Sequence, residues 1–98
     1  MLSLRITLLA KEDLKNIGRY TLKQWGLQQR NSYLSNLNDS FKKLLVMPQI
    51  GASCDHIRQG YRKLREAEHV IFYRISNDIL DVIRILHKSM DIESQDFL

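Results

Sequence analysis

The sequence predicts an α+β protein: one domain over residues 1–98, with a helical hairpin packed on an antiparallel sheet in the order β-α-α-β-β-β. Three observations lead to this prediction. Apolar residues first alternate with polar ones, as in a strand with one buried face. They then recur at spacings of three and four on both sides of Gly26, as in two helices. Finally, three runs rich in β-branched and aromatic residues follow one another with short connections, as in a meander.

The first strand and the first helix are predicted in the N-terminal quarter of the chain. In LSLRITLL, residues 2–9, every second residue from Leu2 is apolar, so one face of a strand is buried. The next stretch, AKEDLKNIGRYTLKQWG, has helical spacing and ends at Gly26. Its N-cap is predicted to be weak, because Leu9 and Ala10 offer no side-chain acceptor. The predicted apolar face of this helix consists of Leu14, Ile17, Thr21 and Trp25.

A second helix and three strands are predicted to follow. The helical pattern ends at Pro48 and Gly51, and a loop covers residues 48–60. The runs YRKLRE, HVIFYRI and ILDVIRIL then predict strands joined by turns at residues 66–67 and 76–78. Such short connections require antiparallel pairing, and the last two strands are apolar on both faces, as central strands are. The apolar residues of the second helix are Tyr33, Leu34, Leu37, Phe41, Leu44 and Leu45.

Composition and charge indicate a cytoplasmic protein with acidic partners. The hydrophobic fraction of 44% and charged fraction of 27% are ordinary for a folded globular protein. One cysteine, Cys54, allows no internal disulfide, and Arg5 and Lys11 interrupt the apolar N-terminus before a signal peptide can form. No apolar run is long enough for a membrane span. The net charge is +4, with eight Lys/Arg against three Asp/Glu in residues 1–51, and this asymmetry suggests acidic partners.

A stripe of basic residues on the first helix is one candidate binding surface. Its members are four residues apart, so they lie on one side of the helix, beside its apolar face. Each like-charged pair at this spacing costs roughly 0.2–0.5 kcal/mol, which a helix tolerates without a partner. The stripe is therefore either a solvated face or a docking surface. It consists of Lys11, Lys15, Arg19 and Lys23.

A second candidate surface is a group of three arginines, Arg62, Arg74 and Arg84, one on each of the last three predicted strands. We expect the pairing of the strands to bring them together. Arginines beside aromatic residues bind phosphates or carboxylates in a bidentate manner. The alternative is that they extend into solvent at the margin of the sheet. If they face a partner, replacing Arg62 and Arg84 by alanine should abolish binding while the fold stays intact.

His87 is the candidate acid/base residue. It ends the last strand beside Lys88, where such a group could act in phosphodiester cleavage, although a polar histidine at a strand end is the commoner case. The remaining histidines and Cys54 lack the spacing of a zinc site, so we expect no metal. Phosphate-binding loops, dinucleotide-binding fingerprints and nucleophile elbows are absent, so we expect no cofactor and no ordinary small-molecule enzyme.

Two segments resemble the ParE toxins of the RelE/ParE superfamily. The run GYRKLREAEHVIFYRISNDILDVIRILHKSMD, residues 60–91, is similar to their C-terminal half, with its YR, VIFYR and I.R.LH...D signatures. The pattern DL..I..Y.....G, residues 13–26, is similar to their first helix. The resemblance implies the β-α-α-β-β-β fold, a ParD-like antitoxin partner, and a toxin that is not an enzyme. Such a toxin would inhibit DNA gyrase by trapping its cleaved-DNA complex.

The resemblance also implies contact residues and an alternative. The RelE relatives are ribosome-dependent mRNA endonucleases, and in that alternative His87, Arg62 and Arg84 would be the catalytic residues. The tail MDIESQDFL has no tyrosine, so the catalytic set of such an endonuclease is incomplete. This favours gyrase as the target. A third reading is a nucleic-acid-binding module without toxicity. The expected contacts with target or antitoxin are Arg62, Arg65, Arg74, Arg84, His87 and Lys88. The expected antitoxin-docking residues on the helices are Lys15, Arg19, Lys23, Trp25 and Tyr33.

Overall fold

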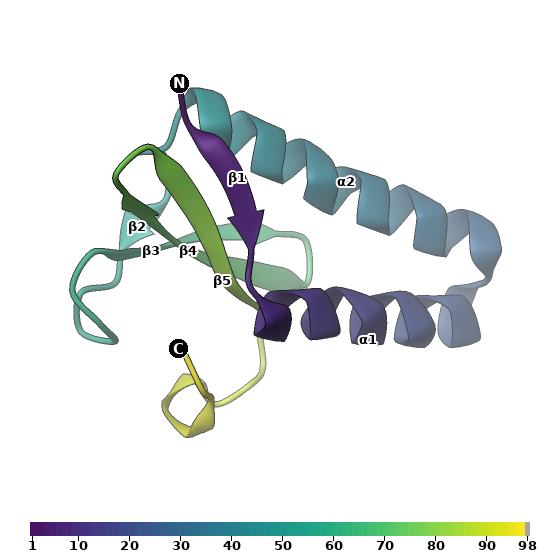
Figure 1. Ribbon diagram of the computed structural model, residues 1–98. Coiled ribbons are helices and arrows are strands. Elements are labelled where there is room, and N and C mark those ends of the chain that lie inside the picture. Colours follow the sequence, from purple (N-terminus) through teal and green to yellow (C-terminus); the bar gives the residue numbers. More distant parts are fainter. Residues whose placement is uncertain (98) are drawn as a thin grey trace.

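The computed structural model describes residues 1–97, and its elements follow the predicted order with one additional strand and a short 3-10 helix. The predicted α+β class, with a helical hairpin on a sheet, is confirmed (Figure 1). The additional strand lies inside the segment predicted as a loop. The elements are β1 (Ser3–Ile6), α1 (Leu8–Trp25), α2 (Leu27–Val46), β2 (Ala52–Ser53), β3 (Tyr61–Glu66), β4 (His69–Ser76), β5 (Ile79–His87) and η1 (Ile92–Ser94).

The sheet has five strands in the order β1-β5-β4-β3-β2. Strands β3, β4 and β5 pair antiparallel, as predicted, with β4 and β5 central, and the additional strand β2 also pairs antiparallel with β3. The edge strand β1 departs from the prediction because it runs parallel to β5, with Ser3 opposite Ile79. Its connection to the rest of the sheet passes through both helices, and a connection of that length leaves either direction open. The sheet is therefore mixed.

The helical hairpin covers one face of the sheet and forms the larger core. Leu37, Phe41 and Leu44 of α2 are almost fully buried there against Ile71 and Tyr73 of β4. Each such side chain contributes about 1.5–3 kcal/mol by leaving water. Figure 1 shows that the hairpin continues beyond the sheet, so its far end is not covered by strands. None of the helices in residues 1–97 has the length and apolarity to cross a membrane.

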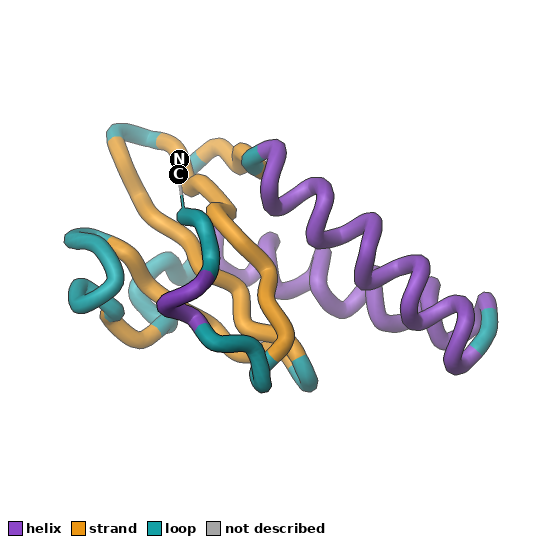
Figure 2. The backbone as a smooth tube through the Cα atoms, turned by 90° about the horizontal axis from the view of Figure 1, so that it is seen from below, coloured by secondary structure: helices purple, strands orange, loops and turns teal. Residues whose placement is uncertain are grey.

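The C-terminal tail, residues 88–97, covers part of the opposite face of the sheet. Figure 2 shows this segment crossing the strands on the side away from the helices. Its Phe97 packs edge-on against Phe72, with ring centroids 5.1 Å apart, and Ile92 packs on the same cluster. The central strands are apolar on both faces because each face has its own core. The buried members of this second core are Cys54, Tyr61, Phe72, Ile83 and Leu86.

The start of α1 differs from the prediction. Thr7, which the alternation placed in the strand, is the N-cap, and its hydroxyl accepts a hydrogen bond of 3.1 Å from the Ala10 N–H. The predicted weak cap is therefore wrong. Leu8 and Trp25 are 84% and 70% exposed, so neither belongs to the buried face to which the sequence pattern assigned it. Gly26 ends the helix as predicted, with φ of +92°.

Candidate functional site

A groove between the two helices is the first candidate site. Its volume is about 550 Å³, and its lining is mainly apolar, including Leu14 and Leu34. Gly18 also lines the groove, and a Cβ at this position would make an ordinary contact of 3.5 Å with Leu34 Cδ1. Leu22 is 42% exposed at the rim. We call this feature the helix groove; its basic residues are Lys15, Arg19 and Arg30.

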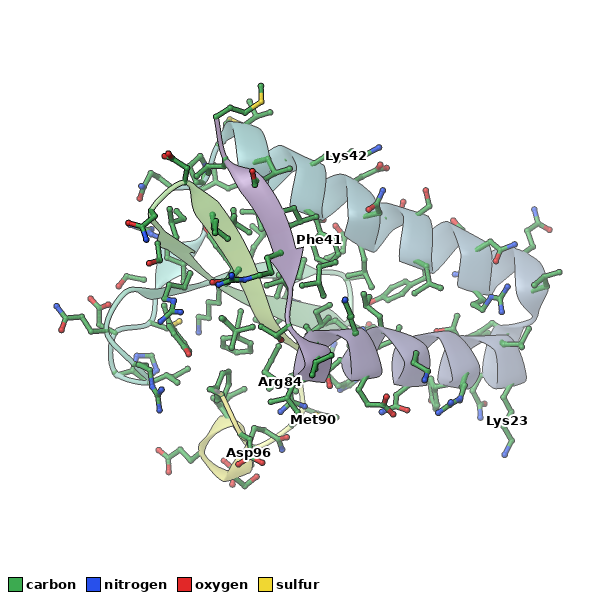
Figure 3. The ribbon with its side chains drawn as sticks, viewed as in Figure 1. Lys23, Phe41, Lys42, Arg84, Met90 and Asp96 are labelled. Carbon is green, nitrogen blue, oxygen red and sulfur yellow. The ribbon has the colours of Figure 1, made fainter. Side chains whose placement is uncertain are left out.

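The predicted antitoxin-docking residues divide into three locations. Lys15 and Arg19 line the helix groove. Lys23 and Trp25 lie at the far end of the hairpin, where Figure 3 shows Lys23 pointing away from the protein. Tyr33 is half-buried on α2, and its hydroxyl contacts the turn between β3 and β4, where the Glu68 N–H donates to it at 3.2 Å. The structure therefore brings only the first two residues together with the groove.

The three sheet arginines do not form one cluster. Arg62 lies opposite Tyr73, whose ring belongs to the core under the helices, and it donates a hydrogen bond of 2.7 Å to the Gly51 carbonyl. Arg74 lies opposite Tyr61 of the second core, so it belongs to the other face. Side chains on paired strands share a face only when their register agrees. The prediction that strand pairing gathers these arginines is therefore wrong.

Arg84 is engaged inside the protein. Its Nε and Nη2 each donate a hydrogen bond of 2.8 Å to the carboxylate of Asp13 on α1, which also accepts from the Ile85 N–H at 2.9 Å. Its Nη1 donates to the Asp96 carbonyl at 2.9 Å, and Figure 3 shows the two residues adjacent. The hydrogen bonds to Asp13 raise the pKa of Arg84. The expectation that Arg84 can be replaced without harm to the fold is therefore corrected.

A second carboxylate, Asp81, engages two more arginines. Asp81 is only 2% exposed, and the Nη2 of Arg5 on β1 donates to it at 3.0 Å. Arg74 Nη2 lies 3.8 Å from the same carboxylate. A buried carboxylate needs such partners, because an unpaired charge away from water is costly. Arg74, like Arg84, therefore has a role within the fold.

A short chain of polar side chains links α2 to the ends of β4 and β5. Tyr33 Oη and His69 Nδ1 share a hydrogen bond of 2.6 Å, and the rings of His69 and His87 meet edge-on with centroids 5.4 Å apart. His87 Nδ1 in turn contacts Ser89 Oγ at 2.7 Å. Sequence reasoning missed His69, because the register shift between Phe72 and Tyr73 brings it opposite His87, whereas the turn alone would place it opposite Leu86. Charge on His87 disfavours the charged form of His69 and so contributes to a lowered His69 pKa.

The alternative catalytic set is not assembled. His87 lies at the same end of the sheet as His69 and Glu66. Arg62 is four residues from Glu66 along β3, which corresponds to roughly 13 Å at strand spacing. Arg84 lies opposite Phe72, which belongs to the second core, and its guanidinium forms an ion pair with Asp13. Nucleophile activation and phosphate binding by these side chains would require them within hydrogen-bond reach of one substrate.

The pair of histidines predicts a pH effect on stability. Burial lowers the pKa of His69, and His87 lowers it further. In the unfolded chain the value returns to about 6.5, so the unfolded state binds more protons below that pH. The free energy of unfolding should therefore fall as the pH drops below about 6.5 and level off below the folded-state pKa.

Urea denaturation between pH 5 and 7.5 measures this effect. Replacing His69→Gln should flatten the pH dependence relative to the unchanged protein, whereas His56→Gln, at an exposed position, should leave it as it is. Equal slopes for the His69→Gln variant and the unchanged protein would contradict the assignment.

Comparisons with known proteins agree with this architecture. Residues 4–92 match a family model described as the ParE toxin of the type II toxin-antitoxin system parDE. The chain is 39% identical over 85 residues to Toxin ParE1 of Mycobacterium tuberculosis (strain ATCC 25618 / H37Rv), covering 86% of this chain and 87% of that protein. It is 33% identical over 87 residues to Toxin ParE1 of Caulobacter vibrioides, covering 89% and 90%.

A solved structure provides an independent comparison of the fold. A chain described as the chromosomal ParDE TA system from P. aeruginosa superposes with a TM-score of 0.78. The match covers 89% of this chain and 96% of that chain, at 21% sequence identity. At this identity the likeness concerns the fold alone, which is the two-helix hairpin on a five-stranded sheet.

Proposed function

Because this chain belongs to the ParE toxin family of type II toxin–antitoxin systems, we propose that it inhibits DNA gyrase in the cytoplasm by trapping its cleaved-DNA complex. We further propose that a cognate ParD-like antitoxin neutralises it. The family match over residues 4–92 is the observation that carries the proposal. The gyrase target is what that resemblance implies, and the site geometry supports a binding mode rather than catalysis.

The helix groove supports an antitoxin helix as its occupant. Apolar side chains in a groove between two helices accept the apolar face of an amphipathic helix. Lys15 and Arg19 on one side and Arg30 on the other favour a helix that carries acids beside its apolar residues. The basic excess of the first half of the chain fits the same kind of partner. We therefore propose that the antitoxin docks in this groove.

Replacing Leu22→Asp should weaken antitoxin binding about tenfold or more, since it places a charge on the apolar rim and repels an acidic partner. Leu22 is exposed, so the fold should tolerate the change. Isothermal titration calorimetry with the purified ParD-like antitoxin measures the effect. Leu8→Asp is the matched control, because Leu8 is also exposed on α1 and does not line the groove. Unchanged affinity in the Leu22 variant would remove the groove from the account.

The residues expected to contact the target differ in how exposed they are and in whether they already have partners within the protein. Arg65 and Lys88 are exposed, and they are the residues that we propose for contact with the target. Arg74 and Arg84 are engaged by Asp81 and Asp13. Arg62 is half-buried and His87 contacts Ser89, so both are secondary candidates.

Expression in cells separates the proposal from the endonuclease alternative. Induction should arrest growth with protein-linked breaks in the chromosome, and coexpression of the antitoxin should restore growth. Growth arrest with cleaved ribosome-bound messages and an intact chromosome would favour the mRNA endonuclease. The dispersed positions of His87, Arg62 and Arg84 argue for the first outcome.

A further inference from the structure

The solvent side of α1 carries a row of cations, of which two line the helix groove and two lie outside it. The members are exposed and follow one another at intervals of four residues. Because each residue of a helix rises about 1.5 Å, the row extends over roughly 18 Å, at about 6 Å per step. We call it the α1 stripe; its members are Lys11, Lys15, Arg19 and Lys23.

Most of the charge of the α1 stripe is not neutralised in the described part of the chain. Lys15 pairs with Glu12 at 3.9 Å. Lys11 and Lys23 take part in none of the ion pairs of the described residues. The sequence from 14 to 38, which contains most of the hairpin, has no Asp or Glu at all. The stripe is therefore available to an external anion.

Polar side chains lie beside the α1 stripe. Asn16 lies three residues before Arg19, and its amide oxygen accepts a hydrogen bond of 3.3 Å from Nη1 of that arginine. Tyr20 is 63% exposed and lies three residues before Lys23, which makes the two side chains neighbours on the helix surface. Amide and hydroxyl groups bind phosphate oxygens together with Lys and Arg. The apolar side of α1, including Ile17, is packed in the core, so it is not free to insert into a lipid bilayer.

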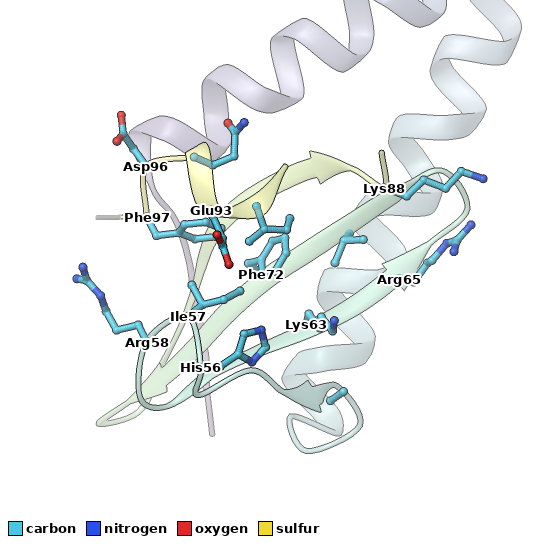
Figure 4. Close-up of a pocket in the computed structure, with 14 residues that line it drawn as sticks. His56, Ile57, Arg58, Lys63, Arg65, Phe72, Lys88, Glu93, Asp96 and Phe97 are labelled. Atoms are coloured by element: carbon cyan, nitrogen blue, oxygen red, sulfur yellow. The ribbon is translucent and has the colours of Figure 1, made fainter. Parts of the chain in front are cut away.

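The other basic surface of the protein is less suited to a chain of phosphates. It is a hollow of about 1000 Å³ on the sheet face opposite the helices, which Figure 4 shows. Glu93 and Asp96 of the C-terminal tail line this hollow together with its basic residues, and Lys88 pairs with Glu68 at 2.8 Å. Repulsion by these carboxylates disfavours a polyanion there. The α1 stripe is therefore the better site for one.

We propose that the α1 stripe binds the phosphate backbone of double-stranded DNA. Its charges are evenly spaced along a line, and a duplex presents about one phosphate per 3.4 Å along each strand. The four cations contact phosphates and not base edges, so binding is independent of sequence and strongly dependent on salt. An antitoxin helix in the helix groove would cover Lys15 and Arg19 and would therefore compete with DNA. The inference concerns DNA that this chain itself contacts, whether or not gyrase is the target.

Fluorescence anisotropy with the full chain and a labelled duplex of about 20 base pairs tests this proposal without gyrase or antitoxin. Four phosphate contacts predict a slope of about −3.6 for the logarithm of the association constant against the logarithm of the salt concentration. Affinity should therefore fall about 150-fold between 50 and 200 mM salt. Polyglutamate and vesicles of anionic lipid serve as competitors for the duplex.

Variants locate the binding on α1. Lys11→Ala with Lys23→Ala should reduce the slope to about −1.8 and the loss of affinity over the same salt range to about 12-fold, because two phosphate contacts are removed. Neither residue lines the helix groove. Lys42→Ala with Lys43→Ala removes the same charge from exposed positions near the C-terminal end of α2 and should leave the slope unchanged.

Thermal unfolding shows whether both variants remain folded. The proposal is overturned if the duplex does not bind at 50 mM salt, or if both double variants have the same slope. It is also overturned if polyglutamate or the vesicles displace the labelled duplex at a lower concentration of charge than unlabelled duplex does.

Discussion

Asp13→Ala should lower the free energy of unfolding by about 3–5 kcal/mol, the usual cost of removing one partner of a buried ion pair. Asp13 is 9% exposed and accepts two hydrogen bonds from Arg84 and one from the Ile85 N–H. Its loss leaves a largely buried guanidinium and a buried backbone donor without their acceptor. The contact also joins α1 to β5, so the hairpin would lose a polar attachment to the sheet.

Urea denaturation measures this change, and Asp39→Ala provides the matched control. Asp39 is an exposed aspartate on α2, so its replacement should change stability by less than about 0.5 kcal/mol. Adding Arg84→Met to the Asp13 variant removes the unpaired charge and should restore part of the loss. An Asp13→Ala protein as stable as the Asp39→Ala protein would show that this pair does not stabilise the fold.

Gly51→Ala should cost about 1–3 kcal/mol, because no space exists for a methyl group. The added Cβ would lie 2.7 Å from Tyr73 Cε1 and 2.8 Å from the Lys63 carbonyl oxygen, and closer still to the Tyr73 hydroxyl. Tyr73 is fully buried, and its hydroxyl donates to the Pro48 carbonyl at 2.8 Å and accepts from the Gly51 N–H at 3.0 Å. Neither the ring nor the backbone of β3 can move away without losing these contacts.

Gly18→Ala is the informative comparison, because the expected sign is opposite. A Cβ at Gly18 would make ordinary contact with Leu34 at 3.5 Å, and glycine inside a helix is destabilising by about 0.5–1 kcal/mol relative to alanine. Chemical denaturation of both variants should therefore give a loss for Gly51 and a gain for Gly18. A Gly51→Ala protein with unchanged stability would mean that the segment before β2 packs differently.

The hydrophobic pattern of the sequence was sufficient to predict the arrangement of the central strands. The runs in β4 and β5 are apolar at consecutive positions, which indicated strands with two covered faces, and the structure covers them with the hairpin and the tail. The short turns fixed the antiparallel pairing of β3, β4 and β5. The direction of β1 has no such local determinant, because its partner strand lies more than seventy residues away in sequence.

The candidate sites were harder to predict because side-chain direction depends on register. A register shift between Phe72 and Tyr73 changes which residues of β5 share a face with β4, and no residue pattern announces it. One signal was available and missed: Asp13 falls on the same helical face as Ile17 and Thr21, and an acid on an apolar face requires a partner. The helix groove depends on the packing of two helices and appears only in three dimensions.

A gyrase cleavage assay shows whether this protein traps the cleaved-DNA complex of gyrase. Purified protein is incubated with gyrase, ATP and closed circular DNA, and half of each reaction is stopped with denaturant. We expect loss of supercoiling together with linear DNA that carries covalently attached protein after the denaturing stop, and both effects should disappear when the antitoxin is added first. Normal supercoiling without linear DNA, from protein that is folded and arrests growth in cells, would contradict it.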